Sequence, residues 1–191
     1  MSRARKLGLY LEIFSTMARN MRVGLKRSLR RPASLSNRRL SEAIDITGLY
    51  PQALTPGDTV RGENWLAGDY TLPGALVKVA NTSPFDVPVA NSQWLASLHG
   101  FDWLRHICAL STQRGPTAAA FYVQDWIRRN PVRQKEAMRP DVTARRLMNW
   151  SAAMPTILPA LERREIDAIR QALSQQSKYL AGCIDEESDG V

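Results

Sequence analysis

The sequence predicts a mainly α-helical fold with one small β-hairpin near residues 69–79. From Ser92 onward, hydrophobic residues recur at three- and four-residue steps, the spacing that places them on one face of a helix. Proline and glycine separate these segments by short connections, which is typical of antiparallel helical hairpins. The chain has 191 residues, 44% of them hydrophobic, which is enough for one ordinary domain with a hydrophobic core.

Residues 1–31 are predicted to form a basic amphipathic helical arm, with the helix over 5–30. Arg31-Pro32 ends it, because proline disfavours helical geometry in the residue before it. Basic side chains fall mostly away from one apolar stripe, whose members are Leu7, Tyr10, Phe14, Met17, Met21 and Leu25.

The positive charge of the chain is concentrated at this end. Residues 1–40 hold eleven of the 26 Lys/Arg and one of the 18 Asp/Glu, a net +10, so the remainder carries −2. One prediction for this end is contact with an anionic membrane surface. Nucleic acid is disfavoured because no DNA-reading motif follows. The alternative is that the apolar stripe packs on the body while the charges are solvated. The contact residues would be Arg19, Arg22, Lys26, Arg27 and Arg30.

Residues 32–63 are rich in proline and glycine and are predicted to be a linker, with at most a helical turn at 41–46. A helical domain follows over residues 64–182. It opens with the hairpin, in which strands at 69–72 and 75–79 flank a turn at Pro73-Gly74. Two strands this short need packing against helices to be stable.

Helices are predicted over residues 92–111, 117–129, 141–153 and 161–181. Ser92 and Asp141 are the expected N-caps, since their side-chain oxygens can accept hydrogen bonds from free backbone N–H groups. Gly182 is the expected C-cap of the last helix, and residues 183–191 are expected to be a polar tail.

Three segments carry a family resemblance. They are Gly57–Gly62 with the following Trp-Leu-Ala-Gly, the Leu-His-x-Phe-x-Trp-Leu element within Trp94–Leu104, and the Arg-x-x-Asn-Trp element within Arg139–Trp150. Together they resemble the N-terminal helical portion of the bacterial heparinase II/III family. The resemblance implies an incomplete (α/α) toroid of a polysaccharide lyase that acts on uronic-acid polysaccharides by β-elimination. The family's catalytic residues have no matching position here, so it implies a truncated segment that is not catalytic alone.

Within these segments the candidate contacts to an acidic polysaccharide are His99, Arg139, Arg145, Asn149 and Trp150. Guanidinium groups bind carboxylates with paired hydrogen bonds, while an aromatic face beside an amide suits a sugar ring. The alternative for each is a role in helix packing or ion pairing. Trp94, Trp103 and Trp126 are expected in the core, and His106 on the surface.

No cofactor or metal is expected. His99 and His106 lie seven residues apart on the predicted helix, about 10 Å along its axis, which is too far for one metal ion. Cys108 and Cys183 cannot build a disulfide framework. The lack of a recognisable signal peptide or membrane span predicts a cytoplasmic protein or one peripheral to the inner membrane face.

Two functions follow from these observations. The first is a non-catalytic toroid segment of a lyase-like protein. The alternative is a non-enzymatic module that binds a carbohydrate or a membrane surface and uses the basic N-terminal arm for that contact. An open helical array would leave one hydrophobic end exposed, so self-association is expected in either case.

Overall fold

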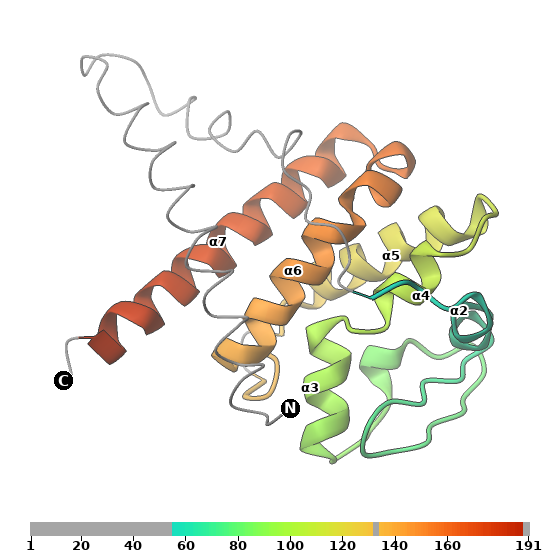
Figure 1. Cartoon of the computed structure of the whole chain (residues 1–191), viewed down its shortest axis with the longest axis horizontal. Helices are drawn as coiled ribbons and strands as arrows, with labels where there is room; N and C mark the ends of the chain where they lie inside the picture. Colours follow the sequence, from blue (N-terminus) through green and yellow to red (C-terminus); the bar gives the residue numbers. More distant parts are fainter. Residues whose placement is uncertain (1–54, 132–133, 189–191) are drawn as a thin grey trace.

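The structure is a computed structural model that describes residues 55–131 and 134–188. The predicted basic arm and most of the predicted linker lie outside these residues. The described part is mainly helical, as predicted (Figure 1). Its elements are α2 (Thr59–Leu66), η2 (Pro84–Asp86), α3 (Ser92–Gly100), α4 (Leu104–Cys108), α5 (Arg114–Arg129), α6 (Pro140–Ile157), η3 (Leu158–Ala160) and α7 (Arg163–Ser188).

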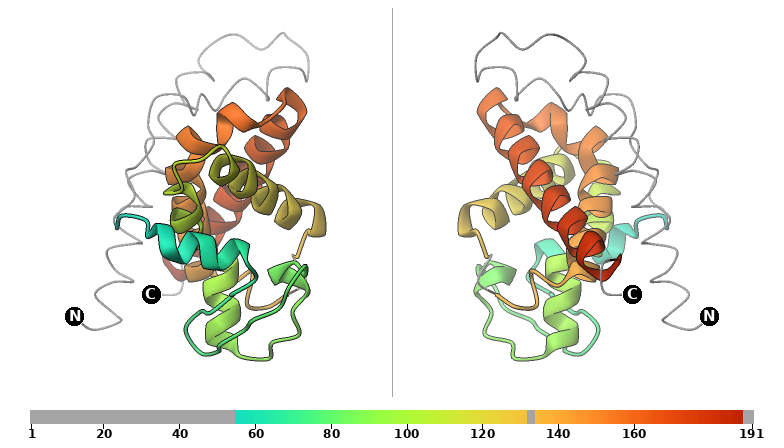
Figure 2. Two further views of the ribbon diagram at one scale, coloured as in Figure 1. Left: turned by 90° about the vertical axis from the view of Figure 1, so that its right-hand side faces the viewer. Right: turned by 90° about the vertical axis from the view of Figure 1, so that its left-hand side faces the viewer.

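Helix α6 is the centre of this arrangement. It contacts α3, α4, α5 and α7, while α2 packs on α4 at the edge of the molecule (Figures 1 and 2). The sequence of α6 explains its position, because apolar or small residues recur on several of its faces and ten of its residues are buried. The described helices do not by themselves establish an (α/α) toroid.

The predicted hairpin is present only as a loop. The described residues contain no strand, and the segment has two isolated antiparallel bridges, Asp69 with Lys78 and Leu72 with Ala75. The predicted turn does form, with Gly74 at a φ of +101°, a conformation that glycine adopts at little cost. A short set of backbone hydrogen bonds joins its two arms, including Tyr70 N–H to the Val77 carbonyl at 2.8 Å and Val79 N–H to the Gly68 carbonyl at 3.0 Å. The Trp94 indole N–H also donates to the Tyr70 carbonyl at 2.9 Å and ties this segment to α3.

The predicted helix over residues 92–111 is interrupted. Helix α3 ends at Gly100, and Phe101 takes the left-handed conformation with a φ of +59° before α4 begins. Non-glycine residues rarely adopt this conformation. Phe101 is fully buried, and burial of its ring compensates for the local cost. The periodicity of the sequence does not reveal the break, because buried residues continue on both sides of it.

Predicted N-caps are displaced by one or two residues. Asn91 caps α3 and accepts from the backbone N–H groups of Gln93 and Trp94, so Ser92 is the first helical residue. Helix α6 begins at Pro140, with Asp141 in its first turn. Proline suits that first position, because the backbone N–H that it lacks would have no partner inside the helix.

Three helix boundaries read from proline and glycine are also wrong. Pro116 lies in the first turn of α5 and Pro155 lies inside α6. Helix α7 continues through Gly182 to Ser188, so the expected polar tail begins as helix. Helix α2 occupies the end of the predicted linker. Proline is tolerated in the first turn of a helix, as at Pro116, because the N–H that it lacks has no partner there. Inside a helix, glycine costs about 1 kcal/mol and proline about 3 kcal/mol, and the buried residues around Pro155 can offset that cost.

Aromatic rings from separate elements meet in the core, and Phe101 is their centre. Its ring centroid lies 5.0 Å from that of Trp103, 5.3 Å from that of Trp150 and 6.3 Å from that of Trp126. Trp103 also stacks on Trp65 of α2 at 4.1 Å. The prediction that Trp94, Trp103 and Trp126 are core residues is confirmed, since none is more than 5% exposed.

Glycine 62 provides a test of the α2–α4 contact. A Cβ atom there would collide with the backbone carbonyl of His106, so we expect Gly62→Ala to destabilise the protein by about 1–3 kcal/mol. Gly182→Ala is the matched control, because it lies inside α7 with open space around it and should be neutral or stabilising by up to about 1 kcal/mol. Urea unfolding followed by circular dichroism measures both. Equal effects would contradict the close packing of α2 on α4.

Candidate functional site

Polar side chains of α6 converge on the carboxyl end of α3. The last carbonyl groups of any helix lack partners within that helix and attract positive charge. Here Arg146 donates to the His99 carbonyl at 2.9 Å, and Asn149 donates to the Gly100 carbonyl at 2.8 Å. The Trp103 indole donates to the Leu98 carbonyl at 3.0 Å. Two side chains distant in sequence, Arg146 and Asn149, and the nearby Trp103 therefore cap α3.

Arg146 is completely buried at the centre of this polar cluster. Its guanidinium also donates to the Ala137 carbonyl at 2.9 Å, to Thr143 at 3.2 Å and to the Gln176 side chain at 2.6 Å. The guanidinium carbon lies 4.2 Å from the ring centroid of Trp126. Burial lowers the pKa of Arg146 to about 9, so the group remains charged at neutral pH.

Arg145 also lies against α3, with its guanidinium at the partly exposed Asp102. The two side chains pair at 2.8 Å, and Asp102 also accepts from Asn149 at 3.2 Å. A weaker contact of 3.4 Å joins Arg145 to the Ala96 carbonyl. The guanidinium that could hold a carboxylate ligand is thus already paired with a carboxylate of the same chain.

His99 is a buried hydrogen-bond acceptor. The Trp126 indole N–H donates to its Nδ1 atom at 3.1 Å, and the residue is 3% exposed. Burial, helped by the nearby positive charge of Arg146, lowers the pKa of His99 to about 4. The imidazole is therefore neutral at physiological pH, with its proton on Nε2.

The two remaining predicted contacts, Trp150 and Arg139, are both occupied within the protein. Trp150 is fully buried and packs edge-on against Phe101 and Trp126, so its face is covered. Arg139 is exposed and pairs with Asp141 of the same turn at 2.9 Å. The structure thus brings His99, Arg145 and Asn149 together around the end of α3, and Arg139 is linked to Arg145 through Asp141, whose carboxylate lies 2.9 Å from Arg139 and 3.8 Å from Arg145.

Several residues of the cluster were not predicted from the sequence. Arg146, Asp102 and Gln176 were missing from the expected contacts, although they hold α3, α6 and α7 together. Arg146 is the arginine of the Arg-x-x-Asn-Trp element, but helical periodicity alone does not say which of two adjacent arginines faces inward. The sequence does contain one indication, the adjacent pair Arg145-Arg146, because positive charge is stabilised near the carboxyl end of a helix.

His106 was expected at the surface and is buried instead. Its Nδ1 atom accepts the backbone N–H of Asp58 at 2.9 Å, which joins α4 to the start of α2. Burial lowers its pKa. Within residues 55–131 and 134–188, no group of three or more potential metal-ligating side chains gathers. Both cysteines are free, and burial raises the pKa of the Cys108 thiol to about 12, which makes it a poor nucleophile.

Comparison with known proteins contradicts the heparinase II/III resemblance. No protein-family model matches the chain, and no solved structure is significantly similar to it. The chain is 27% identical over 157 residues to the FtsZ-localized protein C of Caulobacter vibrioides. This match covers 82% of the chain and 25% of that relative, so the chain spans about a quarter of the relative's length. The assignment to a polysaccharide-lyase family was therefore wrong.

Among the helices of the described residues, none combines the length and apolar character required to cross a bilayer.

The adjacent arginines of α6 give a matched test of the polar cluster. Arg146→Ala leaves a cavity and unpaired buried acceptors, so we expect it to destabilise the protein by about 3–5 kcal/mol. Arg145→Ala removes a partly exposed pair and should cost about 1 kcal/mol. Urea unfolding monitored by tryptophan fluorescence compares the two. Similar costs for both substitutions would show that Arg146 is not the central contact.

The depressed pKa of His99 predicts a specific pH dependence. Protonation favours the unfolded chain, in which histidine titrates near 6.5. The His99 contribution to stability is therefore present above pH 6.5 and falls by up to about 3 kcal/mol as the pH drops toward 4. Nuclear magnetic resonance should show His99 neutral at pH 5.5, and His99→Gln should flatten the stability curve between pH 6.5 and 4. A His99 signal that titrates near 6.5 would refute this burial.

Proposed function

We propose that this chain is a non-enzymatic helical binding module, in which the folded body carries a protein partner and the basic N-terminal arm contacts an anionic membrane surface. The proposal depends on one observation, which is that the polar side chains at the end of α3 form their hydrogen bonds within the protein. Arg146 and Asn149 bond to the backbone of α3, and Arg145 bonds to Asp102. Groups that could have bound a substrate instead hold the helices together.

The likeness to the FtsZ-localized protein C suggests a partner for the body. The name of that relative associates it with FtsZ, and 82% of this chain takes part in the match. We therefore propose that the module works in an assembly that contains FtsZ. Because the chain spans 25% of the relative, the experiment below tests this segment for FtsZ binding directly.

The segregation of charge supports the membrane contact. Residues 1–40 carry a net +10 and residues 41–191 a net −2, so attraction to anionic lipids would act at one end of the chain. Each basic side chain near such a surface contributes about 1 kcal/mol. Self-association and the continuation of the helices into a toroid remain predictions. The acidic polysaccharide is not part of this proposal, because it depended on the rejected family resemblance.

Vesicle binding by the full chain tests the membrane part. Replacing Arg19, Arg22, Lys26, Arg27 and Arg30 by Gln should weaken pelleting with phosphatidylglycerol-containing vesicles by more than about tenfold. The control replaces an equal number of exposed basic residues of the body, Arg61, Lys135, Arg163, Arg164 and Lys178, and should change pelleting much less. Equal losses would show that total charge, rather than the arm, determines binding.

Binding to immobilised Caulobacter FtsZ, measured by biolayer interferometry, tests the protein part. We expect saturable binding by the full chain that survives the five arm substitutions. The Arg146→Ala variant should lose it, because that residue joins the helices of the body. Absence of binding by the intact chain would remove FtsZ as a partner of this segment while leaving the vesicle result unaffected.

A further inference from the structure

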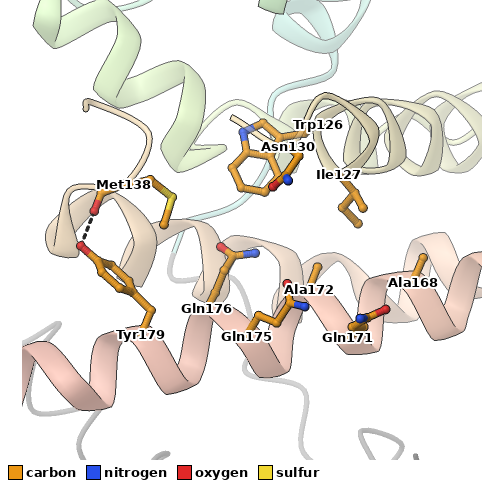
Figure 3. A pocket seen from close by; sticks show the side chains of 10 residues that line it. All are labelled: Trp126, Ile127, Asn130, Met138, Ala168, Gln171, Ala172, Gln175, Gln176 and Tyr179. Atoms are coloured by element: carbon orange, nitrogen blue, oxygen red, sulfur yellow. Dashed lines mark hydrogen bonds between the residues drawn. The ribbon is translucent and has the colours of Figure 1, made fainter. Parts of the chain in front are cut away.

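A groove runs between the carboxyl end of α5 and the middle of α7. Its volume is about 290 Å³, and Figure 3 shows α5 side chains on one side and α7 side chains on the other. The Tyr179 hydroxyl donates to the Met138 carbonyl at 2.6 Å and closes one end. The other lining residues are Trp126, Ile127, Asn130, Ala168, Gln171, Ala172, Gln175 and Gln176.

Gln176 lines this groove and holds a buried hydrogen-bond donor that has no partner in the described structure. The residue is 6% exposed, and its Oε1 atom accepts from the Arg146 guanidinium at 2.6 Å. Arginine has only donors, so the carboxamide oxygen must face it and the NH₂ group must face away. That nitrogen is buried without a partner in the described structure, and Figure 3 shows it directed into the space between the helices. A buried donor without an acceptor is costly, which a bound acceptor would relieve.

The charge behind Gln176 favours an anionic acceptor. Arg146 is fully buried, and its hydrogen-bond partners in the described structure are neutral: the carbonyls of His99 and Ala137, the hydroxyl of Thr143 and the carboxamide of Gln176. A buried cation without a nearby carboxylate creates a positive potential that solvent screens weakly. The hydrogen bond from Arg146 also polarises the Gln176 carboxamide and makes its NH₂ group a stronger donor.

The rest of the groove suits an extended peptide. Trp126, Ile127 and Ala172 give it an apolar wall, while Asn130, Gln171 and Gln175 bring neutral amides that can bond to a peptide backbone. The lining stripe of α7 extends from residue 168 to residue 179, about 16 Å at 1.5 Å per residue. An extended chain of about five residues covers that length.

We propose that this groove binds an extended acidic segment of a partner protein, and that a local shift of the groove wall on binding uncovers Gln176 Nε2, which then donates a hydrogen bond to an Asp or Glu carboxylate of that segment. The segment's backbone lies against the amides of α7, and its apolar side chains face Trp126 and Ile127. This site rests on the proposed function in one respect only, because it would be the protein-binding surface of the module.

A pair of synthetic peptides tests the carboxylate. The probes are acetyl-Ala-Leu-Glu-Leu-Ala-amide and the same peptide with Gln in place of Glu, titrated into the ¹⁵N-labelled full chain to about 5 mM, since so few contacts give about millimolar affinity. We expect saturable shifts of the Gln176 side-chain NH₂ and Trp126 indole signals, with at least fivefold weaker binding of the Gln peptide. Equal binding of both peptides, or no shift at these signals, would overturn the proposal.

Gln176→Glu separates binding from folding. Its carboxylate keeps an acceptor for Arg146 and supplies the missing negative charge, so thermal stability should be maintained or raised. The same carboxylate would repel an acidic ligand, and affinity for the Glu peptide should fall more than tenfold. Gln124→Glu on α5, outside the groove, is the matched control and should change affinity less than twofold.

Unchanged peptide binding in Gln176→Glu, or the same loss in Gln124→Glu, would refute the site. Neither peptide is FtsZ and no vesicle is present, so this result is independent of the proposed function. The peptides could fail to bind the groove while FtsZ and vesicle binding are both observed. The opposite result, peptide binding without FtsZ or vesicle binding, would be distinguished in the same way.

Discussion

Arg146 carries its charge into the middle of the protein, where removing a guanidinium from water costs several kcal/mol. The fold meets that cost with carbonyl oxygens from α3 and the turn before α6, a side-chain oxygen from α7 and the face of Trp126 from α5. One side chain thus fixes the relative positions of four segments. Directional bonds of this kind specify a single arrangement, whereas apolar packing alone tolerates several.

The polar cluster and the aromatic core support each other at the end of α3. Phe101 turns the chain through a left-handed conformation, which exposes the last carbonyls of α3 to the side chains of α6 and brings its own ring against Trp103 and Trp150. If α3 continued as one helix into α4, those carbonyls would be bonded within it and Arg146 would have lost an acceptor. Burial of the Phe101 ring and capping of α3 together offset the strained backbone.

This organisation bears directly on function. A basic and amide-rich motif on a helix resembles a binding site in sequence, yet here its donors are directed at backbone carbonyls and at Asp102. Among the buried side-chain nitrogens without a partner in the described residues are Trp150 Nε1, inside the aromatic core, and Gln176 Nε2, which lies on α7. Gln176 of α7 both bonds to Arg146 and lines the groove, so it connects the buried cluster with the surface. The proposed peptide contact therefore lies at Gln176 and not at the residues that were predicted from the sequence.

By itself the sequence determined the helical class, the burial of Trp94, Trp103 and Trp126, and the end of α5 at Asn130, because periodicity and local caps encode these features within a few residues. It did not determine the hairpin that became a loop, the helix break at Phe101, or the continuation of α7 through Gly182. Gly182 stands in open space, and one glycine costs a helix only about 1 kcal/mol, which does not end a helix as long as α7. The loop and the break at Phe101 depend on contacts between segments that outweigh local preferences of about 1 kcal/mol. The same holds for Arg145 and Arg146, which are equivalent as sequence. Only the tertiary structure decided which guanidinium became the buried centre, because that choice depends on which face of α6 meets α3 and α7.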